Sequence, residues 1–285
     1  MKIGTLSFEI QGADSDKRMV LPSAQRREII ACVADKYSPD LLLCAGFSLD
    51  DNDDLDQLAQ DRRVSGGGTF LIVEVQTDRE LKAARDSGKQ PINFPLHRMY
   101  LVGPRQREQP LGRHQIISQS QELSGRAREE HVDQFEKSIP DKQATIKARN
   151  GNKDLKLFAL CCGEINVLKV RNVIKRDKEV KEANPQVPGA GPALLKADIV
   201  VNPTHDRMSD IFGTLNAKRL WLSQAVDGRA RVYISASNWN SKGRNGRKQS
   251  PDSETLHTVY FSGKRQTMMP LPGQGYMYRE CEVPL

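Results

Sequence analysis

The sequence predicts an α/β domain in which helices cover a mixed sheet or two packed sheets. Apolar strand-like segments alternate with helical patterns along the chain, which is typical of this class. Several of these segments are apolar throughout, as expected of strands covered on both faces. The chain has 285 residues, a normal length for one large α/β domain, and shows no internal repeat or linker. Residues 1–285 are therefore expected to form a single domain.

The first half of the chain predicts strands and helices in alternation. A strand at 2–10 is followed by a helix from Ser23, whose hydroxyl is a suitable N-cap. The apolar run Leu41–Cys44 predicts a buried strand. The acidic stretch 50–63 is expected to be an exposed loop that enters a helix. It is not expected to bind calcium, because it lacks the glycine and the glutamate of an EF-hand loop. Further strands are expected at 69–76, 98–104 and 114–123.

The second half predicts a similar alternation. Residues 124–150 are polar and are expected to be irregular or helical, and a strand at 155–162 precedes a helix at 166–183. A strand at 197–206 reaches its end at Asn202 and Pro203. The remaining expected elements are a helix at 219–228 and strands at 231–239 and 256–266. The C-terminal tail, 266–285, is expected to be extended and to pack at an interface.

The composition excludes several classes of protein. Hydrophobic residues make up 38% and charged residues 28%, which predicts a packed core. No run of about 18 apolar residues would span a membrane, and the apolar N-terminal stretch is too short for a signal peptide and contains Glu9. Five cysteines without a dense framework predict a reducing cytoplasm. No metal-ligand spacing, P-loop or strand-linked GxGxxG stands out, so no metal or cofactor is expected.

The chain is basic, with 43 Lys and Arg against 36 Asp and Glu and a net charge of +7. Such a balance can favour nucleic acid. Here the positive charge is spread along the sequence, and the densest stretch, 241–248, is short and contains glycine. A solvated loop is favoured over a nucleic-acid-binding patch.

A pair of cysteines lies where a predicted buried strand meets a predicted helix, in "FALCCGE" at 158–164. A sulfur at the start of a helix lies near unpaired backbone N–H groups and the positive end of the helix dipole, which stabilise a thiolate. The same N–H groups can bind a developing oxyanion. Cys162 is therefore a candidate nucleophile. The alternative is that both cysteines are core residues and that Glu164 complements the helix dipole.

This segment resembles the strand and elbow of the nitrilase superfamily, the carbon–nitrogen hydrolases, in which a strand ends in Cys, one residue, then Glu or Asp. The segments "KADIVVNP" (196–203) and "PDLLLCAGFSL" (39–49) resemble two further strands that border the pocket in that family. The resemblance implies a four-layer α-β-β-α sandwich, hydrolysis of non-peptide C–N bonds, and self-association. It also implies that Cys162 is the nucleophile, Gly163 the spacer and Glu164 the following acid.

Two of the three catalytic groups of that family have no counterpart in this chain. Ala45 and Gly46 replace the usual Pro-Glu, and no lysine follows the strand at 98–104, where Ser120 aligns. His205, which follows the strand that ends in Asn-Pro, is a candidate replacement for the general base. The remaining candidates are Asp206 or Glu164 as the carboxylate partner, Arg113 or His114 as the cationic group, and Asn202 as a residue that lines the pocket.

Two functions are left open. The first is an amidase-type hydrolase that depends on Cys162. The second is a catalytically inactive nitrilase fold that acts as a ligand-binding or assembly subunit. The expected partners are a small amide-like ligand and a second copy of the chain or another protein.

Overall fold

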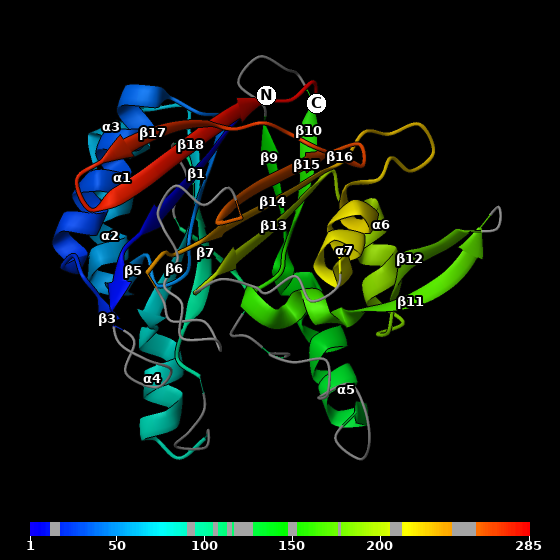
Figure 1. The fold of residues 1–285 in the computed structure, drawn as a ribbon. Helices are drawn as coiled ribbons and strands as arrows, with labels where there is room; N and C mark the ends of the chain where they lie inside the picture. Colours follow the sequence, from blue (N-terminus) through cyan, green and yellow to red (C-terminus); the bar gives the residue numbers. More distant parts are fainter. Residues whose placement is uncertain are drawn as a thin grey trace.

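The computed structural model describes residues 1–11, 18–89, 95–104, 108–112, 116, 128–147, 153–175, 178–205, 213–240 and 255–285. In this part of the chain, two sheets pack face to face and helices cover the outer face of each (Figure 1). The chain therefore has the predicted α-β-β-α sandwich fold. None of its described helices is long and apolar enough to cross a membrane.

The first sheet has eight strands, with three parallel strands, β1, β4 and β6, at its centre and antiparallel strands on both sides. The small strand β5 extends the pairing of β6. In sheet order the bounds are β17 (Met269–Gly273), β18 (Tyr276–Glu282), β1 (Lys2–Phe8), β4 (Leu41–Cys44), β6 (Phe70–Thr77), β7 (Arg98–Val102) and β8 (Gln109–Leu111), with β5 at Leu49–Asp51.

The second sheet has six strands and a similar plan, with β10, β13 and β14 parallel at its centre. In sheet order the bounds are β16 (Lys264–Arg265), β15 (His257–Phe261), β14 (Val232–Ser237), β13 (Ile199–Thr204), β10 (Asp154–Ala159) and β9 (Gln143–Lys147). Two separate two-stranded ribbons are formed by β2 (Ile10–Gln11) with β3 (Arg18–Met19), and by β11 (Leu168–Lys175) with β12 (Lys178–Pro185).

Helices form the outer layers. α1 (Ser23–Tyr37), α2 (Asn52–Gln60) and α3 (Arg62–Ser65) lie over the first sheet, and α6 (Ala190–Lys196) and α7 (Thr214–Ser223) lie over the second (Figure 1). α4 (Arg79–Asp86) and α5 (Arg128–Ser138) lie at the opposite end of the molecule from the two termini (Figure 1). The described residues also include the 3₁₀ turns η4 (Pro140–Lys142) and η5 (Cys162–Val167).

The central core lies between the two sheets and follows the period-two pattern of each strand. In β6, for example, Phe70 and Ile72 belong to the core between the sheets, whereas Leu71 and Val73 pack under the helices. Other members of the central core are Ile3, Leu41, Leu43, Leu157, Ala159, Ile199, Val201, Val232 and Ile234. Because both faces of the central strands are buried, their sequences are apolar throughout, as predicted.

The predicted helix at 166–183 is wrong, because this segment forms η5 and the ribbon of β11 and β12. Leu168 and Val170 alternate with exposed Lys169 and Arg171, and Ala183 on the partner strand completes the buried face. The β-branched residues of this segment also favour a strand over a helix.

Two smaller expectations are also corrected. Ser23 is the first residue of α1 and not its N-cap, and its hydroxyl accepts the N–H of Asp50 at 2.9 Å. The polar stretch 124–150 contains the strand β9 in addition to helical residues, because Ala144 and Ile146 alternate toward the central core. The expected strand at 114–123 lies outside the described residues, apart from Ile116.

The C-terminal tail is extended, and it packs on its own chain. β18 pairs with β1 along its whole length, and β17 forms the outer edge of the first sheet. Proline lacks the N–H that a neighbouring strand would bind, so Pro270 makes this edge a poor template for further strands. An interface at 266–285 stays a prediction.

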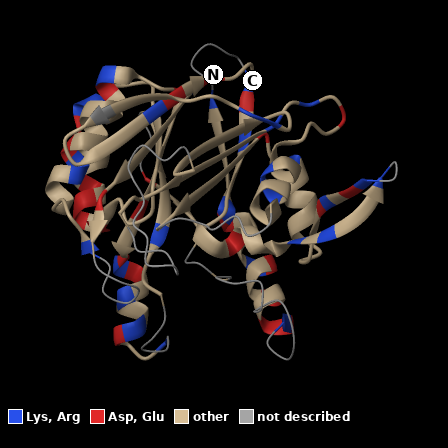
Figure 2. Ribbon diagram, in the orientation of Figure 1, with Lys and Arg blue, Asp and Glu red and all other residues tan. Residues whose placement is uncertain are grey.

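Lys and Arg alternate with Asp and Glu over the described elements (Figure 2). The ribbon of β11 and β12 carries both signs, and Lys175 pairs with Glu182 across it. The basic stretch 241–248 lies outside the described residues. Nucleic-acid binding therefore stays a prediction that rests on net charge.

Candidate active site

Cys162 lies at a strained elbow after β10. Its φ of 41° is in the left-handed region, which a residue with a side chain rarely adopts. The buried amide of Asn202, on the neighbouring strand β13, donates to the carbonyls of Leu160 and Cys162, both at 2.9 Å. The hydroxyl of Tyr233 donates to the Asn202 oxygen at 3.1 Å. Asn202, which the sequence proposed as a pocket residue, thus uses its side chain to hold the elbow.

The two adjacent cysteines have different environments. Cys161 is buried in the central core, and burial, together with the charges of Glu74 and Glu164, raises the pKa of its thiol well above the ordinary value. Cys162 is partly exposed, and its sulfur lies close enough to the ring of His205 to help raise the pKa of that ring. Of the two sulfurs, that of Cys162 is therefore in a position to react.

Glu164 is enclosed beneath the elbow. Its carboxylate accepts hydrogen bonds from Lys142 Nζ at 2.7 and 3.0 Å, from the N–H of Cys161 at 2.8 Å and from the N–H of Ile116 at 3.0 Å. A carboxylate has about four lone-pair sites, so these bonds fill it. Glu164 and Lys142 hold the elbow in place, and Gly163 lies buried between Cys162 and this carboxylate.

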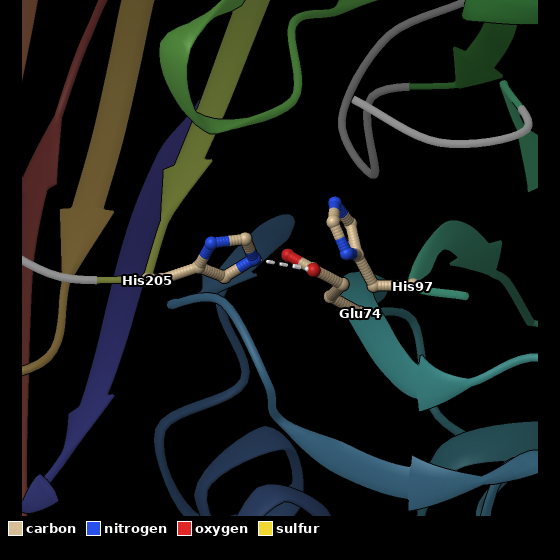
Figure 3. A group of neighbouring side chains, drawn as sticks. All are labelled: Glu74, His97 and His205. Atoms are coloured by element: carbon tan, nitrogen blue, oxygen red, sulfur yellow. Dashed lines mark hydrogen bonds and ion pairs between the residues drawn. The ribbon is translucent and has the colours of Figure 1, made fainter. Parts of the chain in front are cut away.

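His205 lies just after β13, between the elbow and the first sheet. Its Nε2 is 2.6 Å from Oε1 of Glu74 (Figure 3). Its ring also stacks on Phe47 at a centroid distance of 3.8 Å with 8° between the planes. The stacking fixes the plane of the ring, and the contact with Glu74 fixes the direction of Nε2.

Glu74 is the carboxylate that the sequence did not propose. It lies on β6 at the inner face shared by Phe70 and Ile72, and it is fully buried between the sheets. A signal was present, because Glu74 is the one charged residue in the strand FLIVEVQT. A buried charge requires a partner, which is here His205.

The opposite charges of Glu74 and His205 stabilise one another. Burial by itself would lower the pKa of His205, but the Glu74 carboxylate and the Cys162 sulfur together raise it well above the ordinary value. Burial likewise opposes ionisation of Glu74, yet His205 and His97 together bring the pKa of this carboxyl below its ordinary value. The favoured state pairs a protonated His205 ring with an ionised Glu74 carboxylate.

Gly46 stands where the nitrilase family has its general base, and its lack of a side chain has a steric cause. A β-carbon at Gly46 would lie 2.4 Å from Cδ2 of His205 and 3.0 Å from Oε2 of Glu74. The space that a residue 46 side chain would enter is therefore filled by the histidine ring and the carboxylate. Asn238 donates to the carbonyl of Gly46 at 2.7 Å and to that of His205 at 3.2 Å, which ties the two segments together.

A second histidine, His97, lies on the other side of Glu74 (Figure 3). Its ring stands edge-on to that of His205, with 4.9 Å between centroids. Burial lowers the pKa of His97 to about 4, although Glu74 acts in the opposite direction, so the ring is neutral at physiological pH. The sequence around His97 does not predict that its ring lies beside Glu74, because this contact depends on the packing of β7 beside β6.

Three proposed site residues, Arg113, His114 and Asp206, lie outside the described residues. The cationic group for an oxyanion therefore stays a prediction. The role of Asp206 also stays a prediction, whereas Glu74 makes a contact with His205 within the described residues.

No family model and no curated protein matches the chain. A solved glutamine-dependent NAD(+) synthetase from Cytophaga hutchinsonii is similar at 10% identity over 99% of this chain and 42% of that one, with a TM-score of 0.49. Nit3 of Saccharomyces cerevisiae, from branch 10 of the nitrilase superfamily, is 12% identical over 98% and 89%, with a TM-score of 0.46. A carbon-nitrogen hydrolase from Helicobacter pylori G27 is 9% identical over 98% and 88%, with a TM-score of 0.48. Proteins of the kind that the sequence resembles are thus among the structures similar to it.

Proposed function

We propose that this protein is a thiol-dependent hydrolase of amide-like C–N bonds, with Cys162 as nucleophile, His205 as acid and base, and Glu74 as the residue that orients His205. The observation that carries the proposal is the position of His205, which contacts the Cys162 sulfur on one side and Glu74 on the other. A nucleophile, a base and a third group that orients the base form the general arrangement for covalent catalysis.

The reaction would proceed in two halves. The Cys162 thiolate attacks the carbonyl carbon, and the tetrahedral intermediate collapses as His205 gives its proton to the departing amine. The product is a thioester on Cys162. A water molecule then attacks the thioester while His205 takes one of its protons, and the carboxylic acid leaves as the Cys162 thiolate and His205 imidazolium return.

The choice of an amide-like substrate rests on the resemblance of "FALCCGE" to the carbon–nitrogen hydrolase elbow. The chemistry of the site is compatible with it. Amides need protonation of a poor leaving group, and the raised pKa of His205 keeps a proton available beside the Cys162 sulfur.

The test is a panel of small primary and secondary amides, with ammonia or amine release as the readout and intact mass as the measure of a thioester. We expect turnover of at least one amide, loss of turnover in Cys162→Ala, and no change in the matched control Cys32→Ser, since Cys32 is exposed and remote from His205. Turnover that survives Cys162→Ala would refute the proposal.

The second candidate, an inactive fold that binds an amide-like ligand, is favoured by one observation. Lys142, a buried lysine near the elbow, is engaged by Glu164 and is not available to bind an oxyanion. In that case Cys162 would react with alkylating agents, yet no amide would release ammonia or acylate the protein. Ligand binding would then be sought by thermal shift with the same panel.

A further inference from the structure

Three potential metal ligands from separate parts of the chain converge beside Cys162. Glu74 comes from β6, His97 from the segment before β7, and His205 from the end of β13, and the two histidines lie on either side of Glu74 (Figure 3). One ligand atom from each residue lies within 4.8 Å of those of the other two. No spacing in the sequence indicates this cluster, because its members are brought together by the packing of the two sheets.

Two atoms of the cluster lack a well-formed partner. His97 Nε2 and Glu74 Oε2 are both inaccessible and make no hydrogen bond of normal geometry within the described part of the chain, although the N–H of Phe47 lies near the carboxylate. Buried polar atoms without partners are uncommon and costly in native proteins. A cation bound at the Glu74 carboxylate would give Oε2 a partner.

We propose that Glu74, His97 and His205 bind a Zn²⁺ ion, and that this ion switches the thiol site off. Two imidazoles and one carboxylate, with a fourth position open, form a common ligand set for zinc. With bonds of about 2.1 Å the ligand atoms of a tetrahedral site are about 3.4 Å apart. Because the three ligand atoms lie within 4.8 Å of one another, no separation has to close by more than about 1.4 Å, and the 2.6 Å between His205 Nε2 and Glu74 Oε1 has to open.

The two histidines supply nitrogen ligands, and these decide which metal ions the site prefers. Mg²⁺ and Ca²⁺ prefer sites made of oxygen, whereas imidazole suits zinc and neighbouring transition metals.

The inhibitory effect, unlike the binding, rests on the proposed function. Nε2 of His205 and Oε1 of Glu74 bind each other in this structure. An ion between them would break that hydrogen bond, occupy Nε2 and take Glu74 away from its orienting role. Zinc would therefore compete with the arrangement in which Glu74 orients His205 beside Cys162.

The binding test uses isothermal titration of the full chain with zinc chloride, in a Cys32→Ser background that removes the exposed cysteine. We expect one ion per chain, a loss of affinity of at least about tenfold in His97→Ala and in the bulkier His97→Gln, and retained binding in Cys162→Ser. Equal affinity with and without His97, loss of binding in Cys162→Ser, or no binding below millimolar zinc would each overturn the site.

The inhibition test measures iodoacetamide labelling of Cys162 by mass spectrometry, with and without zinc, in the same background and in His97→Ala. We expect zinc to slow labelling at least about tenfold in the background and to have little effect in His97→Ala. If zinc protects Cys162 equally in both proteins, it binds the sulfur directly and the proposal is wrong. If Cys162 is labelled rapidly without zinc and the titration shows no zinc binding, the metal site is rejected and the proposed function is not affected.

Discussion

Gly46 and His205 are sterically coupled, because a β-carbon on residue 46 would lie 2.4 Å from Cδ2 of His205. Gly46 also donates its N–H to the carbonyl of Thr204 at 3.0 Å, which brings the two strand ends together. The absence of a side chain at 46 therefore makes room for the ring of His205. The carboxylate that contacts this ring comes from β6, the strand next to β4, through Glu74.

Gly46→Ala is expected to displace His205 and to slow iodoacetamide labelling of Cys162 at least about tenfold. Overpacking of this kind costs about 1–3 kcal/mol of unfolding free energy. The control is the same change in a His205→Ala background, where the nearest side-chain obstacle is gone and the added cost should shrink. Equal costs in the two backgrounds, measured by urea unfolding, would mean that the two positions are not coupled.

Glu74→Gln is expected to lower the rate of Cys162 labelling and of amide turnover about 10²-fold or more, since a neutral amide cannot stabilise the imidazolium. The matched control is Glu80→Gln, an exposed glutamate that pairs with Arg98 at 2.8 Å and lies outside the site. Comparable rates for Glu74→Gln and Glu80→Gln would remove Glu74 from the mechanism.

The sequence predicts Cys162 and His205 as site residues, because each follows the end of an apolar strand where the chain turns. Local pattern is enough to locate such positions. It could not choose the carboxylate, because the contact between His205 and Glu74 depends on how two sheets pack rather than on any spacing. Asp206, a candidate because it is adjacent to His205 in the sequence, lies outside the described residues.

The prediction of the fold has the same limit: local sequence patterns identify buried strands well and exposed strands poorly. Continuous apolar runs predicted the parallel central strands β4, β6 and β13 correctly, because burial on both faces leaves a strong local signal. The ribbon of β11 and β12 was mistaken for a helix, because its charged residues are solvated and only Leu168, Val170 and Ala183 reach the core. A mostly exposed element leaves a weak period-two signal.

Asn202→Ala is expected to destabilise the protein by about 2–4 kcal/mol, because it leaves the carbonyls of Leu160 and Cys162 without their donor. Tyr233→Phe is the matched control, since it removes one hydrogen bond from the same amide and should cost about 1 kcal/mol. Urea unfolding measures both. If Asn202→Ala cost no more than Tyr233→Phe, the strained elbow would not depend on Asn202.

Lys142→Met is expected to cost about 3–5 kcal/mol, because it leaves the buried Glu164 carboxylate without its cation. A surface pair provides the comparison: Lys137→Met, which breaks the exposed contact with Asp133, should change stability by less than about 1 kcal/mol. The double variant Lys142→Met with Glu164→Gln should recover part of the loss. No recovery would mean that Lys142 stabilises the protein by packing rather than by charge.

The stability of the protein should fall as the pH falls below about 6.5, because of His257. Its ring accepts or donates hydrogen bonds with Thr5 at 2.7 Å and Ser7 at 2.8 Å, and joins the second sheet to the first. Burial, reinforced by Arg279, lowers its pKa to about 3, whereas the unfolded chain has the ordinary value of about 6.5. Between these two values the unfolded state binds the extra proton, so unfolding becomes easier by up to about 1.4 kcal/mol for each pH unit, and the full contribution of His257 is present above this range. Urea unfolding of the protein and of His257→Gln between pH 7 and pH 4.5 should give a shallower slope for the variant. If both slopes are the same, groups other than His257 control the acid sensitivity.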